Sequence, residues 1–131
     1  ADVAIIPQVG VCVDDDVDAA RDMMRWILAL YLGGMGSKKT NFYVDLVSRY
    51  GFEEEAREVQ ELYLAGQKTQ AAQHLSADLI DATCICGPAE HVARRFEDYA
   101  RAGVAELIVL PTPTPGGTQL EQLHRVAALR G

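Results

Sequence analysis

The fold is decided by Cys84-Ile85-Cys86-Gly87-Pro88 and by the later run Glu106-Leu107-Ile108-Val109-Leu110-Pro111. Each is an apolar run that predicts a strand, and the residues between them predict an amphipathic helix. The apolar face of that helix carries Val92, Ala93, Phe96, Tyr99 and Ala100. A strand, a helix and a strand in this order predict a βαβ unit with a right-handed crossover. Because both runs are hydrophobic throughout, we expect parallel strands that are covered on both faces.

The rest of the chain adds one strand and several helices. Residues 8–13 predict the first strand, and the acidic run 14–16 favours the start of a long helix that ends at Gly33-Gly34. We expect Gly87 as the N-cap of the following helix, with Pro88 at its first position. Thr118 and Glu121 match a capping box that opens the last helix. The residues expected to point inward from that helix are Leu120, Leu123, Val126 and Ala127.

Three parallel strands would leave two open edges, which proteins normally cover or close. We therefore predict an α/β fold in which residues 1–131 are the C-terminal part of a (β/α)8 barrel, with a helical insertion at about residues 34–76. Ligands of such sheets bind at the carboxyl ends of the strands. The chemistry is thus expected in the loops after Val13, Cys86 and Leu110. A start at Ala1 suggests a fragment or a processed segment, although a trimmed methionine would look the same.

The composition narrows the class of protein. Of 131 residues, 49% are hydrophobic and 24% charged, as in a globular protein. There is no apolar run of the roughly 20 residues that cross a bilayer and no signal peptide, so we expect a cytoplasmic protein without a membrane partner. The net charge of -7 argues against a nucleic-acid partner.

The cysteines and histidines do not form a metal motif. Cys12, Cys84 and Cys86 lie in apolar runs, which favours reduced, buried thiols over a Cys-x-Cys metal site. The histidines (His74, His91 and His124) share no ligand spacing, so we expect structural roles at the surface. The glycines at 33, 34 and 36 follow a helix, whereas phosphate cradles precede one, and they are not interpreted as a nucleotide loop.

Several short motifs together resemble the luciferase-like flavin/F420 oxidoreductases. They are Tyr31-Leu32-Gly33-Gly34-Met35-Gly36, Asn41-Phe42-Tyr43, Leu46-Val47-Ser48-Arg49-Tyr50-Gly51, Ala65-Gly66, Leu79-Ile80-Asp81, Gly87-Pro88 with Arg95 and Tyr99, and Ala102-Gly103-Val104. Within that superfamily the chain most resembles the C-terminal portion of F420-dependent reductases of the methylenetetrahydromethanopterin reductase type. The resemblance implies a (β/α)8 barrel that binds F420, or FMN in sister groups, and transfers hydride to or from an organic substrate. It also implies that most cofactor contacts lie in N-terminal strands absent from this chain. No catalytic acid or base of this family can be assigned to a residue of this chain.

The resemblance makes three places candidate contacts. Cys86 and Gly87 could touch an isoalloxazine-type ring, although Gly87-Pro88 is also a helix start. Gly116 and Gly117 open a helix where phosphate can bind, although a plain turn explains them equally well. The loop from Met35 to Tyr43, with Met35, Lys38 and Asn41, could line the substrate or be a solvated loop.

These observations leave three functional hypotheses. The leading one is part of a coenzyme F420-dependent oxidoreductase with a small-molecule substrate. The alternatives are an FMN-dependent luciferase-like monooxygenase and a non-catalytic half-barrel that assembles with itself. We expect the isolated chain to be inactive and to be a homo-oligomer. Its outermost strands, either 8–13 and 106–110 or whichever two lie at the edges, would pair with another copy.

Overall fold

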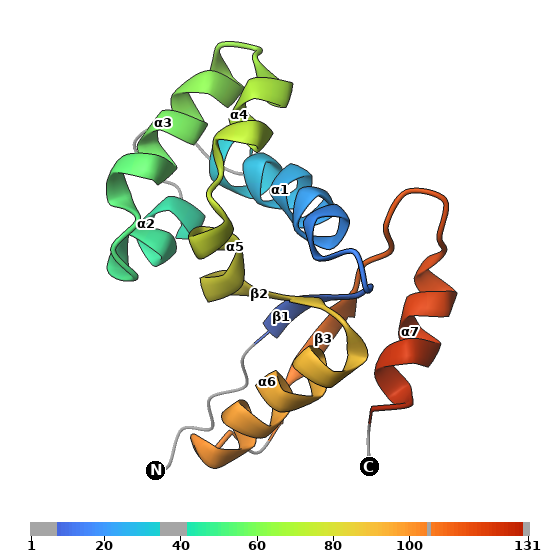
Figure 1. The fold of residues 1–131 in the computed structure, drawn as a ribbon. Helices are drawn as coiled ribbons and strands as arrows, with labels where there is room; N and C mark the ends of the chain where they lie inside the picture. The colour runs from blue at the N-terminus through green and yellow to red at the C-terminus, as the bar shows by residue number, and fades with distance from the viewer. Residues whose placement is uncertain (1–7, 35–41, 105, 130–131) are drawn as a thin grey trace. The chain divides into compact units, whose positions relative to one another are not determined.

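The structure is a computed structural model that describes residues 8–34, 42–104 and 106–129 (Figure 1). The elements are β1 (Gln8–Val13), α1 (Val17–Gly34), α2 (Phe42–Arg49), α3 (Glu53–Leu64), α4 (Lys68–His74), α5 (Ala77–Thr83), β2 (Cys84–Gly87), α6 (Ala89–Arg101), β3 (Ile108–Pro111) and α7 (Gln119–Ala127). They form two compact units. The sheet unit is Ala1–Ala20 with Cys84–Gly131, and the helical unit is Arg21–Thr83, so that α1 begins in one unit and continues in the other.

The sheet unit contains three parallel strands in the order β2-β1-β3. Gly10 of β1 is the Cα partner of Cys84 in β2 and of Leu110 in β3. The predicted α/β class, the parallel pairing and the strand at residues 8–13 are therefore confirmed.

The strands do not lie in chain order. In a barrel wound consecutively, β2 would lie between β1 and β3. Here β1 is central, and β3 pairs with the edge of β1 that β2 leaves open. Unpaired backbone groups along a buried strand are costly, so an apolar strand from the same chain satisfies that edge. The described sheet is open, with β2 and β3 at its edges.

Helices α6 and α7 pack on one face of this sheet. Val92 of α6 and Val126 of α7 are buried against the apolar side chains Val9, Val11, Val13 and Ile85. Partly buried Phe96, Tyr99, Leu107, Val109 and Leu129 surround this cluster. The prediction that the outer strands are covered on both faces is confirmed for β2, which is buried throughout. It is wrong for β3, in which Ile108 and Leu110 are exposed because nothing described packs on that side.

Side-chain caps define the helix starts in the sheet unit. The Asp16 carboxylate accepts a hydrogen bond from Ala19 N–H (3.1 Å) at the start of α1. At α7 the predicted capping box between Thr118 and Glu121 is present. The start of α6 differs by one residue from expectation: Pro88 is the N-cap, and Gly87 is the last residue of β2. Gly87 has a φ of +144°, which a residue with a Cβ rarely adopts.

The predicted inward face of α7 is partly wrong. Leu120 and Leu123 are exposed, as is Ala127, whereas Gln122 and Val126 are buried. Residues 122 and 126 are one helical turn apart and share a face. The helix turns Gln122 toward the sheet because backbone groups of β1 there require a hydrogen-bond partner.

The helical unit is built around α1 from Arg21 onward and the helices α2 to α5. Its buried side chains include Met24, Ala29, Leu32, Val47, Ala56, Val59, Leu75, Leu79 and Ile80. Two polar contacts anchor α1: Arg21 makes a two-point ion pair with Asp81 (3.1 and 2.9 Å), and Arg25 donates to Leu75 O (2.8 Å). Ser76 caps α5 by accepting from Leu79 N–H (3.1 Å).

The glycine pair at the end of α1 has a packing role. A Cβ placed on Gly33 would lie 2.3 Å from the Cβ of Tyr63 on α3. Gly33 therefore allows the two helices to approach closely.

Within the described ranges, none of the helices combines the length and the apolar character that crossing a bilayer requires.

Candidate functional site

The carboxyl ends of the three strands meet at one edge of the sheet, because all three strands are parallel. Backbone hydrogen bonds tie the loops of this edge together. Asp14 N–H donates to Gly87 O (2.8 Å), and Thr112 N–H donates to Val11 O (2.8 Å). The segments that leave β1, β2 and β3 are thus held in fixed relation to one another.

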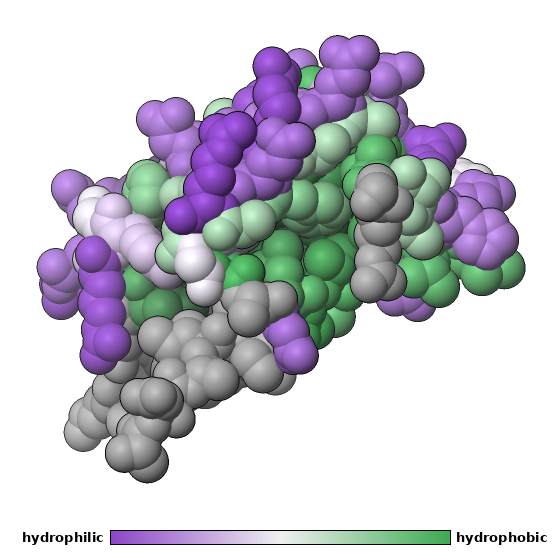
Figure 2. Space-filling view, turned by 90° about the horizontal axis from the view of Figure 1, so that it is seen from below, coloured by the Kyte–Doolittle hydropathy of each residue, from purple (hydrophilic) through white to green (hydrophobic). Residues whose placement is uncertain are grey.

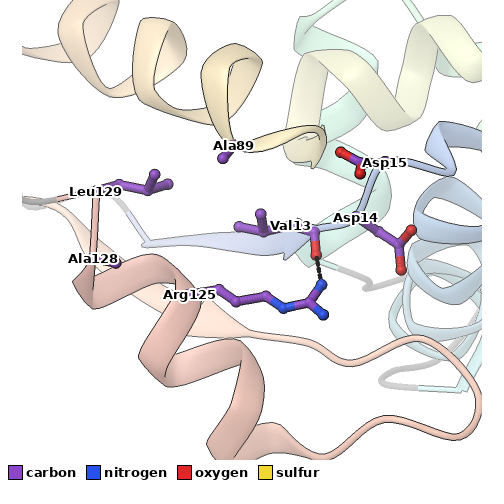
Figure 3. A pocket seen from close by; sticks show the side chains of 7 residues that line it. All are labelled: Val13, Asp14, Asp15, Ala89, Arg125, Ala128 and Leu129. Carbon is purple, nitrogen blue, oxygen red and sulfur yellow. Dashed lines mark hydrogen bonds between the residues drawn. The ribbon is translucent and has the colours of Figure 1, made fainter.

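Helix α7 contributes two polar side chains to this edge. The Gln122 amide accepts from Val13 N–H and donates to Val13 O, both at 2.9 Å. The guanidinium of Arg125 donates to the same carbonyl (3.0 Å), as the dashed line in Figure 3 shows. Because an arginine has five N–H donors in a planar fork, this bond leaves others that can bind an anion or a carbonyl.

A pocket of about 350 Å³ opens beside Arg125. Its lining consists of Val13, Asp14, Asp15, Ala89, Arg125, Ala128 and Leu129 (Figure 3). Ala89 is the first residue of α6, so the lining joins the end of β1 to the start of one helix and the end of another. The pocket therefore combines an apolar wall with one guanidinium and two carboxylates.

The two carboxylates of the pocket differ in their contacts. Asp14 accepts from Asp16 N–H (2.8 Å) and from the Thr114 hydroxyl (3.1 Å). In Figure 3 its carboxylate points away from Leu129 and the apolar wall. Asp15 is exposed at the rim. Asp14 thus holds the loops together, while Asp15 is accessible to a ligand.

The three cysteines carry their side chains away from the cluster of α6 and α7. Cys12 and Cys86 are Cα partners on neighbouring strands, and Cys12, Cys84 and Cys86 are all buried. Burial, and next the charge of Asp14, raise the pKa of Cys12 to about 11, against a smaller lowering by Arg125. A neutral thiol is a poor nucleophile. The prediction that the three cysteines are buried is confirmed, and that they are reduced stays a prediction. The described residues hold no group of three potential metal ligands.

The predicted contacts at residues 86 and 87 lie near the pocket but outside its lining. Cys86 is buried within β2, and the carbonyl oxygen of Gly87 accepts a hydrogen bond from Asp14 N–H. Gly116 and Gly117 lie in an exposed turn in which Gly117 N–H donates to Thr114 O (3.0 Å). Thr118 then caps α7. The lining of the pocket includes neither Cys86 and Gly87 nor Gly116 and Gly117. Met35, Lys38 and Asn41 lie outside the described residues.

Arg125, Gln122 and Asp15 are the residues that the sequence interpretation missed. A signal was available for the first two. Positions 122, 125, 126 and 129 share one face of a helix, and Val126 had been placed inward. Gln122 is a polar residue on the face of Val126, which indicates a buried polar partner, and Arg125 lies beside that face.

Comparison with known proteins gives a consistent family. The family model described as luciferase-like monooxygenase matches residues 1–106. A relative from Mycobacterium tuberculosis, whose name describes it as a coenzyme F420-dependent oxidoreductase, is 35% identical over 128 residues. That alignment covers 98% of this chain but 35% of the relative. The chain therefore spans about a third of the length of the curated relative that it matches.

The fold is also similar to a solved structure. The coenzyme F420-dependent tetrahydromethanopterin reductase of Methanopyrus kandleri superposes with a TM-score of 0.70. The superposition covers 94% of this chain and 33% of that chain, at 22% identity. At that identity the likeness concerns the fold alone.

Proposed function

Because the chain belongs to the luciferase-like monooxygenase family, we propose that it is part of a coenzyme F420-dependent oxidoreductase. In this proposal the enzyme transfers hydride between the reduced deazaflavin and an organic substrate. Residues 1–131 are the C-terminal part of its barrel, in which the strands would lie in chain order rather than in the order β2-β1-β3 that the 131-residue chain has by itself. The observation that carries it is the 35% identity, over nearly the whole chain, to a relative named as F420-dependent. When bound, F420 supplies the hydride donor or acceptor, and the protein supplies binding and orientation.

The pocket at the strand ends fits one part of such a cofactor. The guanidinium of Arg125 is a suitable partner for a phosphate or carboxylate group, which the tail of F420 carries. Val13, Ala128 and Leu129 offer an apolar wall beside it. The carboxylate of Asp15 at the rim would repel a second negative group of the ligand. At about 350 Å³ the pocket admits a portion of the cofactor, and we propose that the remaining contacts come from other parts of the protein.

Arg125 is held for this role by a hydrogen bond to Val13 O, which fixes the guanidinium at the mouth of the pocket. Gln122 accepts from Val13 N–H and donates to the same carbonyl oxygen. A preorganised arginine loses less side-chain entropy when it binds an anion. We propose that Arg125 binds an anionic group of the cofactor and that the apolar wall orients the adjoining part.

An arginine substitution tests this site. Arg125→Ala should weaken F420 binding at least tenfold, measured by fluorescence titration, because a charge-assisted hydrogen bond is lost. Arg101→Ala is the matched control, since Arg101 is an exposed arginine on α6 that pairs with Glu97. It should leave the affinity unchanged. Both substitutions are made in the longest natural polypeptide that contains the chain, and equal affinities of the Arg125 variant and the unsubstituted polypeptide would reject the proposed contact.

The alternative is an FMN-dependent luciferase-like monooxygenase, and the description of the matching family model favours it. An arginine beside an apolar wall would also suit the FMN phosphate. The relative named as F420-dependent supports F420 instead. Titration with both cofactors separates the two proposals.

A further inference from the structure

The three consecutive aspartates after β1 differ in what their carboxylates contact. Asp14 accepts hydrogen bonds from Asp16 N–H (2.8 Å) and from the Thr114 hydroxyl (3.1 Å). Asp16 caps α1 by accepting from Ala19 N–H (3.1 Å). In the part of the chain that the structure describes, no residue donates a hydrogen bond to the exposed carboxylate of Asp15. Two of the three carboxylates thus stabilise the loop, and the third is available to a ligand.

Asp15 lies where a ligand of the sheet would bind. It lines the pocket of about 350 Å³ at the carboxyl ends of the strands, together with Ala89 at the start of α6. In Figure 3 the Asp15 carboxylate points toward the side on which Ala89 lies, whereas that of Asp14 points away from it. Because Asp14 and Asp16 are both held by hydrogen bonds, the loop presents Asp15 at the rim in a defined position.

This corner of the pocket does not depend on where β3 lies. Strands β1 and β2 pair directly, and Asp14 N–H donates to Gly87 O (2.8 Å) at the end of that pairing. The two strands also follow each other in the chain, so they remain neighbours in a barrel that is wound in chain order. We therefore expect Asp15 to keep its place beside the start of α6 in the barrel of the proposed function.

The charged groups of this pocket distinguish it from the larger groove beside β3. That groove has a volume of about 630 Å³, and none of its described lining residues is a lysine or an arginine. Figure 2 shows hydrophobic surface on this side of the molecule, between hydrophilic residues. In the pocket, by contrast, Arg125 can bind a negative group, and Asp15 repels further negative charge. The pocket thus favours a ligand group with one negative charge over a group with two.

The phosphates of the two candidate cofactors differ in charge. F420 carries its phosphate as a diester, which has one negative charge. FMN carries a monoester, whose second ionisation has a pKa of about 6, so that it has nearly two negative charges at pH 7. The glutamyl carboxylates of F420 lie farther along its tail, and exposed charges are screened beyond about 8–10 Å. The charge of the phosphate is therefore the difference that a carboxylate at the rim can detect.

We propose that Asp15 determines the cofactor preference of this enzyme, because its carboxylate disfavours a phosphate with two negative charges and so favours F420 over FMN. This inference rests on the proposed function, in which Arg125 binds the anionic group of the cofactor. In water, the interaction of two neighbouring unit charges changes an affinity about fivefold. Asp15 therefore weakens the binding of the FMN phosphate by a further factor of about five relative to that of F420.

The test is the ratio of two dissociation constants. In the longest natural polypeptide that contains the chain, F420, FMN and riboflavin are titrated by following the intrinsic fluorescence of each. Asp15→Asn should lower the ratio of the FMN constant to the F420 constant about fivefold. It should leave the affinity for riboflavin unchanged, because riboflavin has no phosphate. The matched control is Asp98→Asn, which removes the same charge from an exposed aspartate of α6 outside the pocket and should leave the ratio unchanged.

Four results would overturn the proposal. They are an unsubstituted polypeptide that binds FMN as tightly as F420, an Asp15 variant with an unchanged ratio, a riboflavin affinity that changes as much as that for FMN, and an Asp98 variant that lowers the ratio equally. Binding of F420 in the last three cases would still support the proposed function, whereas its absence would contradict both. Circular dichroism that matches the unsubstituted polypeptide confirms that each variant is folded.

Discussion

The side-chain amide of Gln122 and the backbone of Val13 exchange two hydrogen bonds, each 2.9 Å long. The N–H and C=O groups of a strand residue normally bond to backbone groups of a neighbouring strand. Here β3 pairs with β1 only as far as Val11. Gln122 bonds to Val13, which is the next residue of β1 whose backbone groups face the same side. The buried amide thereby positions α7, and with it Arg125, at the carboxyl edge of the sheet.

Replacing Gln122 by leucine should therefore destabilise the fold. Gln122→Leu keeps a similar volume but leaves the buried N–H of Val13 without a partner, which costs about 1–3 kcal/mol. Urea unfolding measures the change. The control Gln119→Leu alters an exposed residue of the same helix, and we expect a change within about 0.5 kcal/mol. Equal effects of the two substitutions would mean that the amide of Gln122 has no special role.

The stability of the fold should fall at high pH through Cys12. Its folded-state pKa of about 11 lies above the ordinary 9.0. The folded state therefore holds the thiol proton more tightly, and this contribution is fully present below pH 9 and is lost as the pH rises through 11. We expect a loss of up to about 3 kcal/mol from this group.

The control for this prediction is Cys12→Ala, which removes the titrating group. Urea unfolding of both proteins should show a difference in stability that shrinks, or changes sign, between pH 8 and pH 11. A constant difference across that range would show that the Cys12 thiol does not titrate differently in the folded and unfolded states.

Gly33 should not tolerate a side chain. In a helix, Gly→Ala ordinarily stabilises by about 0.5–1 kcal/mol. At Gly33 the new Cβ would lie 2.3 Å from the Cβ of Tyr63, so we expect a net loss of about 1–3 kcal/mol from overpacking. Thermal unfolding of Gly33→Ala measures it. Should this variant unfold at a higher temperature than the unsubstituted protein, the close approach of α1 and α3 would be wrong.

Local patterns in the sequence predicted most elements but not their arrangement. The strands at residues 8–13 and 84–87, the capping box at Thr118 and the end of α1 each depend on neighbouring residues. The position of β3 beside β1 depends instead on which strand edge needs a partner, and no short stretch of sequence encodes that requirement.

The residues of the candidate site also depend on contacts between distant parts of the chain, which local patterns do not reveal. Apolar spacing in α7 suggested Leu123 as an inward residue, whereas the structure buries Gln122. The reason is the hydrogen-bonding requirement of Val13, which is 109 residues away in the chain. Arg125 is exposed, and its bond to Val13 O follows from the placement of α7 that Gln122 sets.

We expect the 131-residue chain to show no oxidoreductase turnover by itself. Hydride transfer needs cofactor and substrate held rigidly against each other, and the chain spans 35% of its F420-dependent relative. A steady-state assay that follows F420 absorbance over a panel of organic substrates checks this. Turnover by a preparation free of contaminating enzyme would contradict the expectation.

The most direct test of the proposed function is a paired titration with F420 and FMN. It uses the 131-residue chain and the longest natural polypeptide that contains it, and it follows the intrinsic fluorescence of each cofactor. We predict saturable binding of F420 by the longer polypeptide, at one cofactor per chain and at least tenfold tighter than that of FMN. Preference for FMN would support the monooxygenase alternative, and binding of neither cofactor would contradict both.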